Sequence, residues 1–215
     1  MQNDEELADK AYELVAIGIS YWQTGDLDCA LENYLKALEL LKSRGNPIFF
    51  IEDLDIIEDL GDIYRTMGNY IKAIKCYENA RGPNNLLIGN VYYYNIKDYN
   101  NAIKIYVDLL NISADPSYAT AAFNLSKMSW KGEGIPQNYI NALQWINVAI
   151  SMTPDNVDFQ NTFDKLKNDM TALEIETATL LTIEWLNNRD EVIHKLKNEN
   201  PWHLLASVTG GEGSI

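Results

Sequence analysis

An internal repeat in the first half of the chain constrains the fold more than any other feature of the sequence. Residues 14–37 and 57–80 carry matching residue types at identical offsets, which is the pattern of one structural unit used twice. The shared positions are Leu14, Ile17, Gly18, Tyr21, Gly25, Ala30, Tyr34 and Ala37 in the first copy, and Ile57, Leu60, Gly61, Tyr64, Gly68, Ala73, Tyr77 and Ala80 in the second. One unit cannot bury its apolar face alone, so this repetition predicts a stack of similar units.

Each copy predicts a helix, a tight turn and a second helix packed antiparallel to the first. Small residues, Gly18 with Ala30 and Gly61 with Ala73, are expected at the helix crossing, where they let the backbones approach closely. The glycine of each turn is expected to adopt a left-handed conformation, which glycine reaches without a steric penalty.

Two weaker copies follow the strong pair. The third runs from Leu86 to Leu109, with Asn90 in place of the small glycine and Lys97 in place of the turn glycine, so looser local packing is expected. The fourth runs from Leu125 to Ala149 and has a longer turn that contains the sequence Gly-Glu-Gly-Ile-Pro.

These residues place the chain in a recognisable class. The first three copies resemble tetratricopeptide repeats, and the fourth is similar to a Sel1-like repeat, so that together they cover residues 10–152. The resemblance implies an all-α fold, a right-handed superhelical solenoid of antiparallel helix pairs with three tetratricopeptide-like repeats, one Sel1-like repeat and C-terminal capping helices. We expect the solenoid at residues 1–155, capping helices at 156–206 and a flexible tail at 207–215. Within the cap, apolar spacing predicts a helix over 156–187 and a short helix from Asp190.

The charge of the chain limits its partners. There are 17 Lys and Arg residues against 31 Asp and Glu residues, a formal net charge of −14. A nucleic-acid or anionic-lipid partner requires a basic surface, so neither is expected. The longest uncharged stretch, 135–154, carries a polar residue at every third position and therefore predicts an amphipathic helix, not a membrane span. An acidic N-terminus and two isolated cysteines, Cys29 and Cys76, favour a cytoplasmic location without disulfides.

No recognisable catalytic motif is present, and neither an enzyme nor a cofactor is expected. The feature closest to a catalytic or metal site is an acidic cluster in which Asp55, Glu58 and Asp62 lie at i, i+3 and i+7, on one face of the second repeat's first helix. Three convergent carboxylates can bind a hard cation. A solvated acidic face is the favoured interpretation, followed by a surface that binds a basic partner.

The resemblance implies where a partner would bind, because in tetratricopeptide families the first helices line a concave groove. The groove-facing positions predicted here to contact a partner are Tyr12, Val15, Ile19, Trp22, Asp55, Glu58, Asp62, Arg65, Leu87, Val91, Tyr94, Phe123 and Lys127. The first four form an apolar patch and the next four an acidic one. Val15, Ile19, Asp55 and Asp59 stand where co-chaperone repeats use Lys, Asn and Arg to hold a terminal carboxylate, so a co-chaperone function of that kind is not expected.

The favoured function is a non-enzymatic adaptor that binds a protein or peptide segment with basic and hydrophobic residues in this concave groove. One alternative is a dedicated chaperone or immunity-type neutraliser of a basic bacterial toxin or effector. A less favoured alternative is a metal-dependent hydrolase that uses the acidic face. The oligomeric state stays open.

Overall fold

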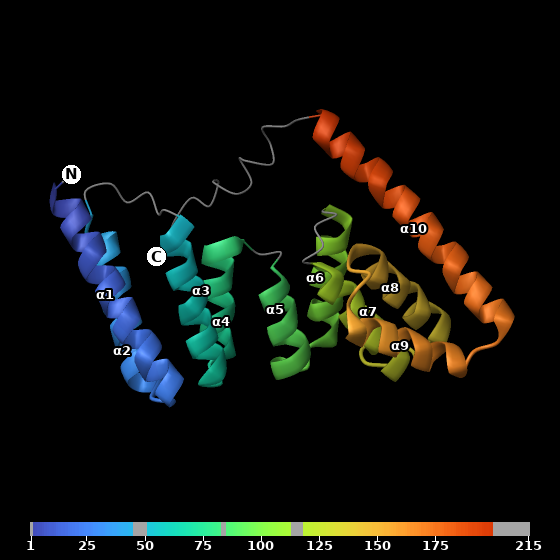
Figure 1. The fold of residues 1–215 in the computed structure, drawn as a ribbon, viewed down its shortest axis with the longest axis horizontal. Coiled ribbons are helices and arrows are strands. Elements are labelled where there is room, and N and C mark those ends of the chain that lie inside the picture. The colour runs from blue at the N-terminus through green and yellow to red at the C-terminus, as the bar shows by residue number, and fades with distance from the viewer. Residues whose placement is uncertain (1, 45–50, 83–84, 113–117, 200–215) are drawn as a thin grey trace. The chain divides into compact units, whose positions relative to one another are not determined.

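The computed structural model describes residues 2–44, 51–82, 85–112 and 118–199, and every regular element within these ranges is a helix (Figure 1). The predicted all-α helical-repeat class is therefore confirmed. The chain divides into two compact units, unit 1 (Met1–Val91) and unit 2 (Tyr92–Ile215). Each unit is described on its own.

Unit 1 contains the two strong repeats as two helical hairpins. Its helices are α1 (Gln2–Thr24), α2 (Leu27–Lys42), α3 (Ile51–Thr66), α4 (Tyr70–Arg81) and the short α5 (Leu86–Asn90). Helix α1 pairs with α2, α3 pairs with α4, and α2 packs against α3, so the hairpins stack as the repeat predicts. The core lies between α1, α2 and α3.

The turns of the two hairpins are built alike. Gly25 and Gly68 have φ of 84° and 79°, as predicted for the turn glycines. Asp26 and Asn69 then cap the second helix of each hairpin, accepting hydrogen bonds from backbone N–H groups in the first turn.

Each repeat requires glycine at its small position mainly because a tyrosine ring packs there, and less because of the alanine at the helix crossing. A Cβ atom on Gly18 would lie 2.6 Å from the Tyr34 ring, and one on Gly61 would lie 2.5 Å from the Tyr77 ring. Both rings are fully buried, and close packing in a protein core restrains such rings. Each glycine therefore makes room for the aromatic ring of its hairpin partner.

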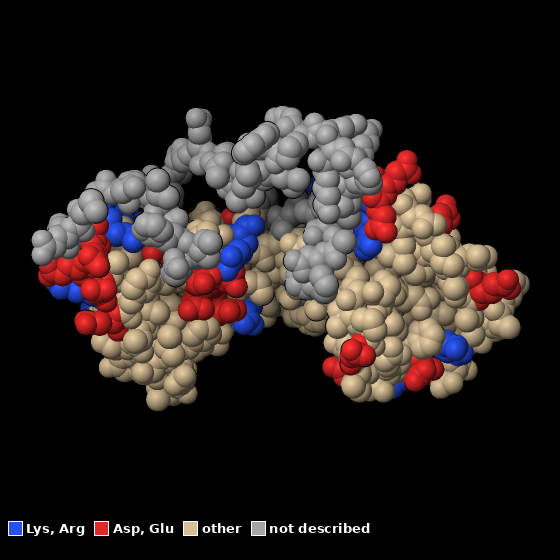
Figure 2. Space-filling view, turned by 45° about the horizontal axis from the view of Figure 1, so that its top comes forward, with Lys and Arg blue, Asp and Glu red and all other residues tan. Residues whose placement is uncertain are grey.

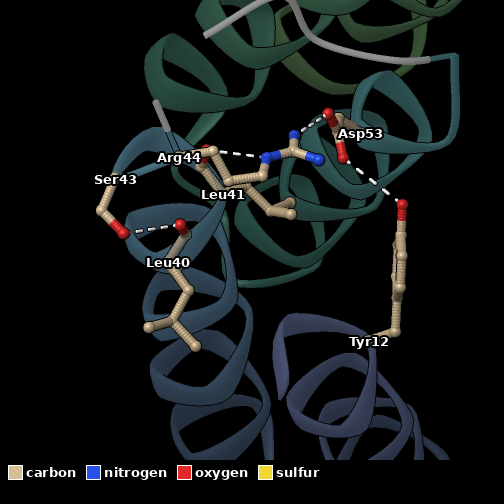
Figure 3. Close-up of polar contacts among 6 residues, drawn as sticks. All are labelled: Tyr12, Leu40, Leu41, Ser43, Arg44 and Asp53. Atoms are coloured by element: carbon tan, nitrogen blue, oxygen red, sulfur yellow. Dashed lines mark hydrogen bonds and ion pairs between the residues drawn. The ribbon is translucent and has the colours of Figure 1, made fainter. Parts of the chain in front are cut away.

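A buried ion pair ties the two hairpins of unit 1 together (Figure 3). The Arg44 guanidinium, just beyond α2, pairs with the Asp53 carboxylate in the first turn of α3, and its Nε donates to the Leu41 carbonyl at 3.1 Å. The Tyr12 hydroxyl of α1 donates to Asp53 at 3.5 Å. Because Asp53 has no solvent exposure, these contacts replace the water that its charge would otherwise require.

Unit 2 contains the weaker repeats and the C-terminal helices. Its elements are the end of the π-helix η1 (Val91–Ile96), then α6 (Tyr99–Ile112), α7 (Ala119–Lys131), α8 (Tyr139–Met152), α9 (Val157–Asn168) and α10 (Ala172–Glu199). Helices α7 and α8 form a hairpin, α9 packs on α8, and the long α10 packs along α8 (Figure 1). Packing explains the second glycine of the Gly-x-Gly turn, because a Cβ atom on Gly134 would lie 2.4 Å from the Tyr99 Cβ.

The C-terminal helices differ from the sequence prediction. Helix α9 ends at Asn168 and α10 begins at Ala172, so the helix predicted over 156–187 is interrupted at residues 169–171. Helix α10 then continues through Asp190, where a new helix was expected. A capping box explains the break, since the Thr171 N–H donates to the Glu174 carboxylate at 2.8 Å and the Glu174 N–H donates to the Thr171 hydroxyl at 3.4 Å. The predicted tail at 207–215 lies outside the described residues.

The third repeat shows how the chain accommodates the missing glycines. In the two strong repeats the amide after the turn glycine bonds a carbonyl five residues earlier, whereas Asp98 bonds the Tyr92 carbonyl, six residues earlier. The wider turn belongs to the π-helix η1. Lys97, in the place of the turn glycine, has a φ of 64°, which costs a side chain about 1–2 kcal/mol.

We expect Gly61→Ala to lower the free energy of unfolding by about 2 kcal/mol, because the added methyl group overlaps the buried Tyr77 ring. Urea denaturation measures the loss. Ser20→Ala, at an exposed position of α1, is the control and is expected to change stability by less than about 0.5 kcal/mol. A Gly61→Ala protein as stable as the wild type would contradict this packing.

We expect Lys97→Gly to raise the free energy of unfolding by about 1 kcal/mol, because glycine adopts positive φ without strain. The matched control is Lys104→Gly on an exposed face of α6, where the same change is expected to lower stability by about 1 kcal/mol. The two substitutions should therefore shift the denaturation midpoint in opposite directions, and shifts of the same sign would contradict the assignment.

Candidate functional site

The predicted apolar patch on α1 is partly exposed. Tyr12 and Ile19 are exposed, whereas Val15 and Trp22 are partly buried and pack against the core of unit 1. The first pair is available to a ligand, and the second pair also has a structural role.

Helix α1 exposes a second apolar face that the sequence prediction assigned to the core. Ile17 is 47% exposed, whereas Leu60 at the same position of the second repeat is 1% exposed. Tyr21 is 39% exposed, against 9% for its counterpart Tyr64. The α3 residues are covered by the preceding hairpin, and no described helix covers the α1 residues in the same way. Comparing the two copies position by position reveals this face.

The three carboxylates of the predicted acidic face, Asp55, Glu58 and Asp62, lie on α3 and have partners from the same hairpin. Arg81 at the end of α4 pairs with both Asp55 and Glu58, and its Nε donates to the Glu58 carboxylate at 2.8 Å. Arg65 pairs with Asp62 at 2.8 Å. Arg65, predicted as a groove residue in its own right, therefore serves to neutralise its neighbour.

Two aspartates of α3 also accept hydrogen bonds from the repeat tyrosines. The Tyr34 hydroxyl donates to Asp59 at 2.9 Å, and the Tyr77 hydroxyl donates to Asp62 at 2.8 Å. Burial raises the pKa of both tyrosines, so the hydroxyls stay protonated and act as donors. Burial likewise raises the pKa of Asp59, and the neighbouring carboxylates add to that effect.

This arrangement gives the cation-binding alternative no support. Two guanidinium groups already lie against the carboxylates, and among the described residues no group of three or more His, Cys, Asp and Glu side chains is arranged to hold a metal ion. Figure 2 shows acidic and basic side chains next to one another on the part of the surface that belongs to α1–α4. Four carboxyl groups (Asp55, Glu58, Asp59 and Asp62) against two guanidinium groups leave a residual charge of about −2.

The remaining predicted residues fall into two groups. Leu87 is partly buried in α5, and Val91 is fully buried, so Val91 contributes to packing and not to a surface. In unit 2, Tyr94, Phe123 and Lys127 come together, with the Lys127 ammonium 4.9 Å from the Tyr94 ring centre and 5.0 Å from the Phe123 ring centre.

Two further residues of this region were missed by the sequence prediction. Tyr93 lies with its ring centre 5.5 Å from the Lys127 ammonium, and the fully buried Asn124 accepts a hydrogen bond from the Tyr94 hydroxyl at 2.6 Å. A lone amide within the small and apolar run 121–125 is the signal that points to Asn124. We call Tyr93, Tyr94, Phe123 and Lys127 the lysine–aromatic cluster.

Comparisons with known proteins agree with this fold. The family described as tetratricopeptide repeat matches residues 14–40 and 54–80, the two strong copies. Among solved structures, the chain is similar to c5321, a protective antigen present in uropathogenic Escherichia coli strains that displays a Sel1-like repeat fold, with a TM-score of 0.54 and 16% sequence identity. The match covers 87% of this chain and 37% of that one. A search of curated proteins found no match.

Residues 14–40 and 54–80 are therefore tetratricopeptide repeats, as the two strong copies predict, and the chain has a helical-repeat fold similar to the Sel1-like repeat fold. Repeats of this type are generally scaffolds for protein–protein interaction and are typically not enzymes. Within the described ranges, no helix combines the length and the apolar character that crossing a membrane requires.

We expect Asp59→Asn to raise the melting temperature at about pH 7. The raised pKa of Asp59 means that the folded protein holds a proton at pH values above 3.8, the ordinary value, where the unfolded chain has released it. Stability therefore falls as the pH rises from 3.8 through the raised pKa. Asparagine keeps an oxygen that accepts from Tyr34 but carries no charge.

Thermal melts followed by circular dichroism between about pH 3 and pH 8 test this effect. The advantage of Asp59→Asn should shrink toward low pH, where the wild-type carboxyl is protonated in both states. Asp155→Asn, at an exposed position of unit 2, is the control and should show no such trend. A variant that melts below the wild type at neutral pH would contradict the argument.

Proposed function

We propose that unit 1 is a docking module for a segment of another protein, and that the segment binds to α1 and to the acidic face of α3. The observation that carries this proposal is the concentration of exposed large apolar side chains on α1. Tyr12, Ile17, Ile19 and Tyr21 are all exposed on this one helix. Monomeric proteins rarely expose apolar side chains in such density unless the surface binds something.

The α1 side chains supply the affinity in this proposal. Aromatic and aliphatic groups that become fully desolvated dominate the energy of most interfaces. Tyr12 and Ile19 occupy predicted groove positions on one side of α1 and serve as the anchors. The hydrogen bond from Tyr12 to Asp53 orients the ring before binding and so lowers the entropy cost of association.

The acidic face supplies orientation. Asp55 stays largely exposed although it pairs with Arg81, so a basic residue of the partner can still reach it. The residual negative charge favours a partner segment with one or two Lys or Arg residues beside its apolar side chains. The narrower role of neutralising a strongly basic toxin or effector rests on charge alone, and Arg65 and Arg81 reduce that charge at this surface.

We expect Ile19→Glu to abolish partner capture, because it places a charge at the centre of the apolar surface. The tagged full-length protein is used to capture proteins from an extract of its native host, and quantitative mass spectrometry compares the wild type with the variant. Retention of the true partner should fall about tenfold or more. Asp55→Lys should reduce capture at low salt and have less effect at high salt.

The matched control is Ile71→Glu, which makes the same change at the most exposed large apolar residue of α4. It should leave capture unchanged. Circular dichroism confirms that each variant keeps its helix content. If every protein retained by the wild type is retained equally by Ile19→Glu, α1 is not the docking surface.

A further inference from the structure

The lysine–aromatic cluster of unit 2 holds a cation in a fixed position. The Lys127 ammonium of α7 lies 4.9 Å, 5.0 Å and 5.5 Å from the ring centres of Tyr94, Phe123 and Tyr93. It also donates a hydrogen bond to the Tyr94 hydroxyl at 2.8 Å. Three rings and one hydrogen bond restrain a side chain that is usually among the most flexible in a protein.

Buried groups brace the residues that hold Lys127. The fully buried Asn124 accepts from the Tyr94 hydroxyl at 2.6 Å and donates its amide to the Tyr106 hydroxyl at 3.1 Å. Because the Tyr94 proton points toward Asn124, the oxygen of Tyr94 is left to accept from Lys127. The Phe123 ring lies 4.9 Å from the ring of Phe159.

Tyr93 is braced separately by the fourth repeat, since its hydroxyl donates to Glu133 at 2.6 Å. Both tyrosines come from the π-helix η1, and their ring centres are 4.5 Å apart. Consecutive residues of an α-helix point about 100° apart, whereas here two consecutive rings flank the same ammonium. Single turns of π-helix are frequent at functional sites, where they redirect side chains in this way.

The Lys127 ammonium has capacity for a further ligand. An ammonium has three N–H donors, and one of them goes to Tyr94. Among the described residues no carboxylate forms an ion pair with Lys127, although the chain has a large excess of acidic residues. Tyr94 is exposed and Lys127 partly exposed, so a ligand can reach the donors from solvent.

We propose that the lysine–aromatic cluster binds a glutamate or aspartate side chain of a partner protein, with apolar residues beside that carboxylate packing on the exposed ring of Tyr94. The rings exclude water from one side of the ammonium, which strengthens a charge-assisted hydrogen bond. A carboxylate fits better than a phosphate, because a dianion suffers more repulsion from a chain with a net charge of −14. This site is distinct from the docking surface of unit 1, and it selects the opposite charge.

A titration of the isotope-labelled full-length protein, followed by NMR amide shifts, tests the site. The probe is a pentapeptide with blocked ends and a central glutamate between leucines, and its matched partner carries glutamine instead. A third peptide has the glutamine but a free C-terminus, which separates a side-chain carboxylate from a terminal one. The blocked glutamate peptide should shift the amides of Tyr94, Asn124 and Lys127, and shifts caused by the free-terminus peptide alone would contradict the proposal.

Two variants and a control assign the interaction. Lys127→Gln should weaken binding about tenfold, the loss expected for one charge-assisted hydrogen bond. Tyr94→Phe keeps the ring and removes the hydroxyl that positions the ammonium, so it should weaken binding to a smaller extent. Lys131→Gln removes the same charge from an exposed position on the same helix and should leave binding unchanged.

Several results would overturn the proposal. Equal binding of the blocked glutamine peptide would show that the rings bind apolar groups and that the site does not distinguish a charged side chain from a neutral one. Equal weakening by Lys131→Gln would show a general charge effect. Tighter binding of a phosphoserine peptide would show that the site prefers a phosphate to a carboxylate. An absence of shifts with every peptide would show that the cluster is not a binding site.

Discussion

The contact on which unit 1 depends is a tyrosine ring laid over a glycine, with its hydroxyl on an aspartate. Tyr34 occupies the space left by Gly18 and donates to Asp59 on the next hairpin, whereas Tyr77 occupies the space left by Gly61 and donates to Asp62 on its own hairpin. The ring requires a position without a side chain, and its buried hydroxyl requires an acceptor. These two requirements fix both the distance within a hairpin and the register between hairpins.

Because two aspartates of α3 accept hydrogen bonds from tyrosines, fewer of its carboxylates are available to a ligand than the sequence suggests. Asp59 and Asp62 are committed to packing, and Arg81 is shared by the two carboxylates closest to solvent. What distinguishes the surface of unit 1 is therefore the apolar character of α1. Unit 2 shows the reverse arrangement, in which aromatic rings lie around one partly exposed cation, Lys127.

The repeat pattern was sufficient to predict the helix pairs, the turn glycines and the face of α3 that carries the acids, because each depends on residues close in sequence. Contacts between distant residues could not be predicted. Arg81 meets Glu58 only after the hairpin closes, and the partners of Lys127 come from two different repeats. The break before α10 was predictable in principle, since the Thr171 and Glu174 capping box is visible in the sequence.

The exposed face of α1 has a consequence for how such a chain can change in length. At Ile17 and Tyr21 it carries residue types matching those that α3 buries beneath the preceding hairpin. A tandem duplication that placed another hairpin before α1 would find a compatible surface already in place. Growth of the array at this end therefore requires a gene rearrangement and an acceptor for the tyrosine of the added hairpin, because α1 carries Ala16 where α3 carries Asp59.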